Sequence, residues 1–151
     1  MSERINFNTT SPAGMKALAG VYSYLSQSGL AHDIIELIFL RVSQINGCAY
    51  CIDMHTKALH KAGTPWDKIV LTQVWREAGK WFSSREGAAL AWAESVTLIA
   101  ATQAPDAVFA AVQAEFSDKE ICDMTIAIGL MNAWNRMAIG LRKLPDSAPE
   151  V

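Results

Sequence analysis

Apolar residues recur at intervals of three and four positions along most of the chain, which is the periodicity of an amphipathic α-helix. A clear example near the N-terminus is the series Met15, Leu18, Val21, Tyr22 and Leu25. Alternating valine-, isoleucine- and threonine-rich runs closed by Asn-Gly or Asp-Gly turns are missing from the sequence. Residues that favour helices, such as alanine, leucine, methionine and glutamate, dominate instead. The pattern therefore predicts an all-α fold.

Residues that start and stop helices divide this pattern into successive segments. Ser117, with Glu120 three residues later, forms a capping box at a helix start, and Ser83 or Ser84 caps an earlier helix. The dipeptide that ends at Gly47 suits a helix C-terminus. We expect helices at about 12–29, 31–44, 48–63, 65–74, 84–100, 105–114 and 118–141, and a flexible tail at 145–151.

The length of 151 residues fits one domain, and no repeat, low-complexity tract or linker divides the sequence. We therefore expect a single domain over 1–151, with its core at about 10–142. Apolar residues make up 51% of the chain and charged residues only 19%. A small lone domain has a large surface to cover with polar groups, so this balance predicts a homo-oligomer that buries apolar surface between subunits.

Charge and hydropathy exclude several classes of partner. The net charge is −2 and no basic cluster is present, so we expect no nucleic-acid partner. Glu36 and Arg41 interrupt the longest apolar runs, which fall short of the roughly 18 residues of a membrane span. The N-terminal segment has no apolar core of a signal peptide, so we expect a cytoplasmic protein. In that reducing compartment, a close cysteine pair is more often catalytic or metal-binding than structural.

Cys48, Cys51 and His55 carry the strongest chemical signal in the sequence. An α-helix turns by about 100° per residue, so these three side chains fall on one narrow stripe where neighbours touch. The first turn of a helix stabilises a thiolate through its exposed N–H groups and its dipole. An imidazole one turn later is placed to accept the thiol proton. The spacing thus indicates a redox-active or nucleophilic cysteine site.

The spacing alone leaves open which cysteine reacts first. Cys51 lies four residues before His55, which favours Cys51 as the thiol that the histidine activates. Cys48 lies nearer the helix N-terminus, which favours Cys48 as the better stabilised thiolate.

Glu36 is the candidate acceptor that would orient the histidine. It has apolar residues on both sides along a predicted helix, so an inward-facing carboxylate there needs a partner. A hydrogen bond to His55 would supply that partner and complete a proton relay of cysteine, histidine and glutamate. The alternative is an ion pair between Glu36 and Arg41 or Arg76.

The spacing of the four candidate residues resembles a known active-site signature, that of the AhpD-like branch of the carboxymuconolactone decarboxylase family. In this chain eleven residues separate Glu36 from the motif Cys48-x-x-Cys51-x-x-x-His55. Segments 40–51, 116–117 and 132–136 also resemble this family, so that the resemblance covers about residues 10–142. One position departs from AhpD itself, which has a histidine immediately before its second cysteine where this chain has Tyr50.

The resemblance implies an AhpD-like helical bundle that assembles as dimers, trimers or hexamers. It also implies a cysteine-dependent peroxidase with an antioxidant role. Cys51 would attack the peroxide, Cys48 would resolve the product to a disulfide, and Glu36 with His55 would relay protons. A dithiol or a lipoylated protein would serve as the reductant. We expect neither a cofactor nor a bound metal.

Other interpretations of the same residues remain open at this point. The cysteine pair could act as a non-catalytic redox sensor or as a general disulfide reductase, or it could bind a structural zinc ion together with His55 and Glu36. Lactone decarboxylation is the less favoured inheritance, because that branch of the family typically lacks the cysteine pair. Cys122 is expected in the core, and His32 at the surface. Asn132 and Asn135 are expected to satisfy buried hydrogen bonds.

Overall fold

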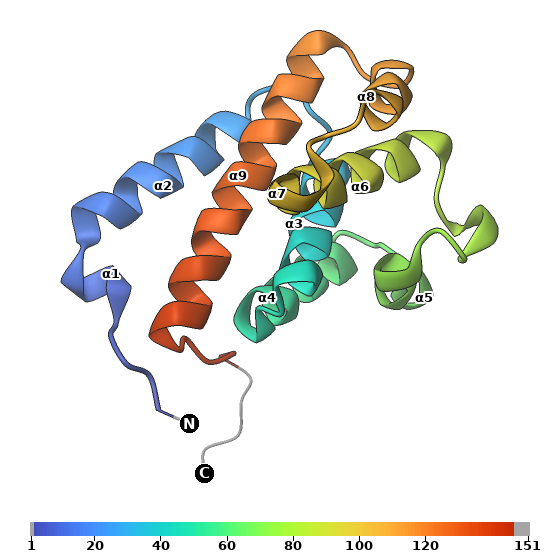
Figure 1. Cartoon of the computed structure of the whole chain (residues 1–151). Helices are drawn as coiled ribbons and strands as arrows, with labels where there is room; N and C mark the ends of the chain where they lie inside the picture. The colour runs from blue at the N-terminus through green and yellow to red at the C-terminus, as the bar shows by residue number, and fades with distance from the viewer. Residues whose placement is uncertain (1, 147–151) are drawn as a thin grey trace.

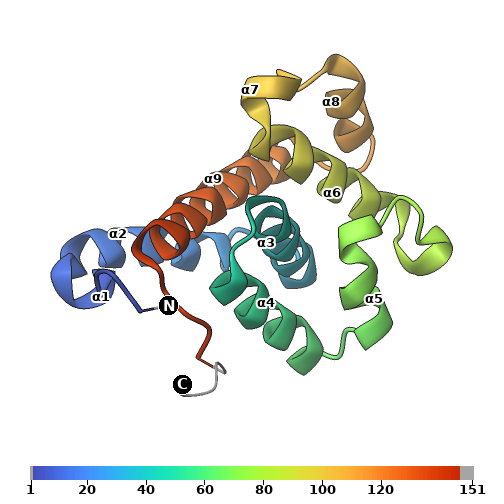
Figure 2. The same ribbon diagram turned by 60° about the horizontal axis from the view of Figure 1, so that its bottom comes forward.

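One helix, α3 (His32–Asn46), lies at the centre of the molecule. Seven successive residues of α3, from 34 to 40, are buried, so that every face of this stretch is covered. A surface helix buries a single stripe, whereas a helix that is buried all round must have neighbours on every side. Here α4 (Ala49–Lys61), α6 (Ser84–Thr97) and α9 (Asp118–Leu141) supply those neighbours, and Figure 2 shows α3 among them.

The computed structural model describes residues 2–146, and within them every regular element is helical. The prediction of an all-α fold is thus confirmed, and the helices form one domain (Figure 1). The helices and their bounds are α1 (Phe7–Thr10), α2 (Pro12–Leu25), α3 (His32–Asn46), α4 (Ala49–Lys61), α5 (Trp66–Leu71), the short 3₁₀ helices η1 (Thr72–Val74) and η2 (Gly79–Trp81), α6 (Ser84–Thr97), α7 (Ile99–Thr102), α8 (Asp106–Gln113) and α9 (Asp118–Leu141).

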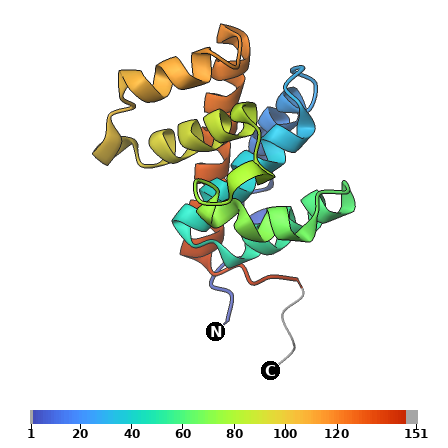
Figure 3. The ribbon, with the colours of Figure 1, turned by 90° about the vertical axis from the view of Figure 1, so that its right-hand side faces the viewer.

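The helices pack in two groups around α3. On one side, α2 runs beside the long helix α9 (Figure 1). On the other side, α8 packs along α6, as Figure 3 shows from a second direction. Helix α4 folds back against α3 after a tight turn, and this pair carries the candidate site.

Side-chain caps begin four of the described helices, namely α1, α4, α6 and α9. Ser83 and Ser117 each accept a hydrogen bond from the backbone of a glutamate three residues later, and the glutamate side chain returns to the serine backbone. Both capping boxes agree with the prediction. Gly47 ends α3 with a φ of 71°, a left-handed conformation that glycine adopts without steric cost.

Two helix predictions were wrong, and a third prediction lies mostly outside the described residues. Helix α1 was not predicted, because a single turn capped by the Asn6 side chain leaves no periodic pattern. The predicted helix 84–100 breaks at Leu98, and the separate helix α7 follows. The Thr102 hydroxyl at the end of α7 donates to the carbonyl oxygen of Ser95 at 2.7 Å and holds the two helices together. The predicted flexible tail at 145–151 falls mostly on residues 147–151, which lie outside the described residues.

Glu94 joins α6 to the central helix. Its carboxylate accepts hydrogen bonds from Arg41 of α3 at 2.8 Å, from the Trp75 indole at 2.9 Å and from Arg76. Burial alone would raise the pKa of Glu94, but these hydrogen bonds and the Arg41 charge outweigh burial and hold the pKa below its usual value. The ionised carboxylate therefore contributes to the stability of the fold.

Within the described residues, no helix is long and apolar enough to cross a membrane. Several large apolar side chains are nevertheless exposed on α7, α8 and α9, among them Ile99, Phe109 and Ile126. The homo-oligomer that the composition suggests stays a prediction.

We predict that the Glu94→Gln variant is less stable than the wild type by about 2 kcal/mol near neutral pH, the range of hydrogen bonds to charged groups. Because folding lowers the pKa of Glu94, its contribution is present above the unfolded pKa of about 4.5 and is lost as the pH falls through the folded value. The difference should therefore shrink towards low pH in urea unfolding curves. Glu77→Gln, at an exposed position, is the control. An equal loss in both variants, or a difference that does not depend on pH, would contradict the assignment.

Candidate active site

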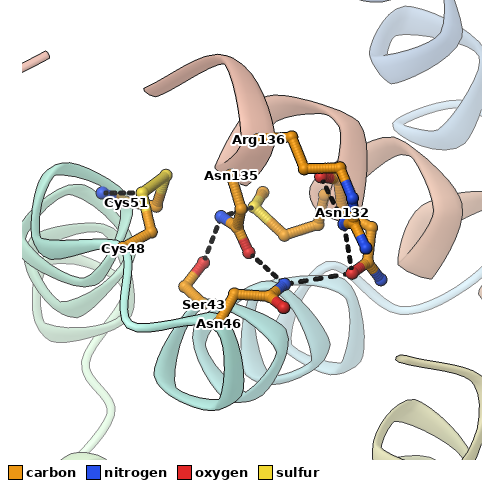
Figure 4. Close-up of a disulfide and its surroundings, with 8 residues drawn as sticks. Ser43, Asn46, Cys48, Cys51, Asn132, Asn135 and Arg136 are labelled. Atoms are coloured by element: carbon orange, nitrogen blue, oxygen red, sulfur yellow. Dashed lines mark hydrogen bonds between the residues drawn. A yellow bond between two sulfur atoms is a disulfide. The ribbon is translucent and has the colours of Figure 1, made fainter. Parts of the chain in front are cut away.

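The turn between α3 and α4 brings two cysteines together. Gly47 reverses the chain and Cys48 becomes the N-cap of α4, where its sulfur accepts a hydrogen bond from the Cys51 N–H at 3.3 Å. Cys48 and Cys51 form a disulfide, with their Cα atoms 5.4 Å apart (Figure 4). Both are almost fully buried, with exposed fractions of 1% and 2%. The predicted pair thus forms at a helix N-terminus, where a thiolate is stabilised after reduction.

A network of polar side chains holds the end of α3 against α9. The Asn46 amide donates to the side-chain oxygens of Asn132 at 3.0 Å and of Asn135 at 2.8 Å. Asn135 in turn donates to the Ser43 hydroxyl at 3.1 Å, and Arg136 reaches Asn132, as Figure 4 shows. The expectation that Asn132 and Asn135 satisfy buried hydrogen bonds is confirmed. Because this network fixes the last turn of α3, it also fixes the turn that positions the disulfide.

Glu36 and His55 form a buried pair across α3 and α4. The Nδ1 atom of His55 lies 2.8 Å from Oε2 of Glu36, and the two side chains are only 5% and 4% exposed. A carboxylate in this position accepts the Nδ1 hydrogen of the neutral imidazole, which leaves Nε2 as a free acceptor. Nε2 is indeed buried without a hydrogen-bond partner among the described residues. The predicted contact exists, and its free nitrogen lies one turn after Cys51.

Aromatic rings surround this pair. The Phe39 ring packs on the imidazole with 5.1 Å between centroids, and Tyr22 and Trp134 pack against Phe39 in turn. Burial raises the pKa of Tyr22, and the nearby charge of Glu36 raises it further. The surroundings are therefore poor in water, so that the interaction between the carboxylate and the histidine is weakly screened.

The alternative partners of Glu36 are not its neighbours here. Arg41 and Arg76 both bind Glu94 instead, so the predicted alternative of an ion pair between either arginine and Glu36 was wrong. His32, which we expected simply at the surface, is 59% exposed but places Nε2 4.0 Å from Oε1 of Glu36. The sequence does indicate this contact, because His32 and Glu36 are four residues apart on one helix and such side chains are neighbours.

Cys51 lines a pocket that the sequence did not predict. The cavity has a volume of about 410 Å³ and lies between α1, α2, α4 and α9. Cys48 is not among its lining residues, so of the two cysteines only Cys51 faces the pocket. Its walls are mostly apolar, and the residues that line it are Phe7, Asn8, Met15, Lys16, Ala19, Tyr50, Cys51, Met54, Met131, Trp134 and Ala138.

Cys122 does not belong to the core. We expected it there, but it is an exposed free cysteine on α9. The core face of α9 contains Ile121, Met124 and Ile128, and Cys122 lies about 100° around the helix from Ile121. Apolar residues occur on several faces of this helix, so their pattern did not show which face points into the core.

The structure offers no ligand set for the zinc alternative. Across residues 2–146, no group of three or more histidine, cysteine, aspartate or glutamate side chains is arranged to hold a metal ion. The two cysteine sulfurs bond to each other, and Glu36 binds one nitrogen of His55. The four predicted site residues therefore form a disulfide beside a hydrogen-bonded pair.

Comparisons with known proteins identify the family of the chain. The sequence model of the carboxymuconolactone decarboxylase family matches residues 12–95, which contain all four site residues. The uncharacterized protein YdfG of Bacillus subtilis is 36% identical over 141 residues, which cover 93% of this chain and 95% of YdfG.

Two solved structures share the fold. One is a protein of unknown function from Agrobacterium tumefaciens, proposed to be the antioxidant defence protein AhpD. It has a TM-score of 0.94 and 44% identity, with 97% of this chain and 100% of that chain covered. The other is an uncharacterized peroxidase-related protein from Ralstonia eutropha with an AhpD core. At 23% identity, a TM-score of 0.82, and coverage of 93% and 74%, it supports the fold alone.

We predict that an alkylating reagent modifies one of the three cysteines of the folded, oxidised protein. Cys122 is exposed, whereas Cys48 and Cys51 are buried and bonded to each other. Reduction followed by unfolding should make all three available, and peptide mass spectrometry would locate each adduct. Modification of Cys48 or Cys51 before reduction would contradict the arrangement described.

Proposed function

The chain belongs to the carboxymuconolactone decarboxylase family, and from this premise we propose that it is a thiol peroxidase of the AhpD-like branch. It reduces hydroperoxides to alcohols with Cys51, Cys48, His55 and Glu36. The observation that carries the proposal is the position of Cys51, which both pairs with Cys48 and lines the pocket. A peroxide in that pocket would reach Cys51 first.

The reduced enzyme begins the reaction with a proton transfer. His55 accepts the thiol proton of Cys51 at Nε2, and Glu36 stabilises the imidazolium through Nδ1. The Cys51 thiolate then attacks the terminal oxygen of the hydroperoxide, so that an S–O bond forms and the O–O bond breaks. The leaving alkoxide takes the proton from His55 and departs as the alcohol, which leaves Cys51 as a sulfenic acid.

Cys48 completes the oxidation. Its sulfur attacks the Cys51 sulfenic acid, the S–S bond forms, and the hydroxide takes the Cys48 proton and leaves as water. Cys48 is well placed for this step, because as N-cap of α4 it lies beside Cys51. An external dithiol, such as a lipoylated protein, then returns the disulfide to two thiols and becomes a disulfide itself.

Two neighbouring functions use the same residues. A redox sensor would undergo the same oxidation without turnover by a dithiol, and a general disulfide reductase would exchange disulfides without a need for peroxide. The pocket at Cys51 favours the peroxidase over both, because a sensor of small oxidants or an exchange with large proteins gains little from an apolar pocket of small-molecule size.

We predict that Cys51→Ser abolishes peroxide consumption in the presence of a dithiol, because the attacking sulfur is lost. Cys48→Ser should still react once and should stop at the sulfenic acid of Cys51, which a dimedone adduct would reveal by mass spectrometry. Cys122→Ser is the matched control and should retain full turnover, because Cys122 is remote from the pair in sequence and is exposed. Undiminished turnover by Cys51→Ser would rule the proposal out.

The His55→Gln variant should react with peroxide about 100-fold more slowly at neutral pH, because it lacks the general base. Since an unassisted thiol ionises with a pKa of about 8.5, the rate of this variant should approach the wild-type rate as the pH rises above that value. Glu36→Gln should show the same trend to a smaller extent. Stopped-flow oxidation of the reduced proteins across the pH range would measure both. A loss that does not recover at high pH would indicate misfolding rather than loss of the base.

A further inference from the structure

The pocket at Cys51 has a buried, apolar floor at one end and an exposed rim at the other. Cys51, Met131 and Ala138 are at most 3% exposed and form the floor. Asn8 and Lys16 also line the pocket, but they are exposed and therefore lie at its rim. A molecule that fills the cavity would thus place one end beside the sulfur and the other beside polar groups.

The charge at this rim is positive. Of the described residues that line the pocket, Lys16 alone carries a charge, and it forms no ion pair with any other described residue. A second lysine, Lys143, lies over the ring of Tyr50, another lining residue, at 5.6 Å from the ring centroid. Lys143 is paired with Asp146, whose strongly exposed carboxylate lies 3.8 Å from the Lys143 ammonium. The rim therefore differs in sign from the chain as a whole, whose net charge is −2.

The size of the pocket bears on its ligand as well. A volume of about 410 Å³ lies within the range of small-molecule sites, which is roughly 300–1,000 Å³. Hydrogen peroxide would occupy a small part of this space and would gain nothing from apolar walls. An organic hydroperoxide with a hydrocarbon body would displace water from those walls and bring its peroxide group to Cys51.

We infer that the pocket selects hydroperoxides whose apolar body carries a carboxylate, and that Lys16 is the residue that selects them. This inference rests on the proposed peroxidase function. The apolar body lies against the walls, the peroxide group lies at Cys51, and the carboxylate lies at the rim within reach of the Lys16 ammonium. Lys16 is a specificity residue and does not take part in the transfer of oxygen.

The test compares three hydroperoxides of similar shape. They are cumene hydroperoxide, its para-carboxylate, and the methyl ester of that carboxylate. Stopped-flow fluorescence would give the second-order rate constant for oxidation of the reduced protein by each, since Trp134 lines the pocket and reports on it. At low ionic strength, the wild type should react about fivefold faster with the carboxylate than with the ester, the size of one surface ion pair. Added salt should reduce this ratio.

Three lysine variants test whether Lys16 causes the preference for the carboxylate over the ester. In Lys16→Met the ratio of carboxylate to ester rates should fall to about one, and in Lys16→Arg it should return. Lys61→Met, at an exposed lysine outside the pocket, makes the same change in net charge and should keep the wild-type ratio. Equal rates for carboxylate and ester in the wild type, or a preference that survives Lys16→Met, would overturn the inference alone. If none of the three compounds oxidised Cys51, the peroxidase proposal itself would fall.

Discussion

The hydrogen bond between Glu36 and His55 is the constraint on which the site depends. A carboxylate at 3% exposure in an apolar helix would be costly without a partner, and His55 is the partner that α4 supplies. The same contact fixes which nitrogen of the imidazole is free, because Nδ1 faces Glu36. It also fixes how α4 lies against α3, and with it the place of Cys51. The geometry of the site thus depends on this buried hydrogen bond, and removing His55 would leave Glu36 buried with only the more distant His32 as a partner.

Much of this architecture could be predicted from local sequence. The capping serines Ser83 and Ser117 and the turn glycine Gly47 act on their immediate neighbours, so a short motif is enough to place them. Cys51 and His55 belong to one helix and Cys48 is its N-cap, so a short stretch of sequence is enough to bring the three together. The partner of Glu36 was harder to predict. A carboxylate among apolar residues indicates that it has a partner, but the pattern does not identify which residue that is. The structure decided between His55 and the two arginines.

The pocket could not be predicted in this way. Its walls come from α1, α2, α4 and α9, so that Lys16 near one end of the chain and Trp134 near the other line one pocket only through tertiary packing. Cys122 shows the related limit within one element. Helix α9 has apolar residues on more than one face, so periodicity could not give its rotation about its own axis. That rotation is set by the helices that pack against α9, and the local pattern of one helix does not show which of its faces they cover.

The turn at Gly47 has a consequence for how such a sequence can vary. Glu36 lies on α3 and its partner lies on α4, and the chain between them holds the rest of one helix and one tight turn. Inserting or deleting a single residue within 37–46 would rotate Glu36 by about 100° around the axis of α3 and direct its carboxylate away from His55. Substitutions in this stretch change side chains one at a time, whereas a change of length shifts the register of the whole site. The number of residues between Glu36 and Cys48, eleven in this chain, is therefore set by the contact between Glu36 and His55.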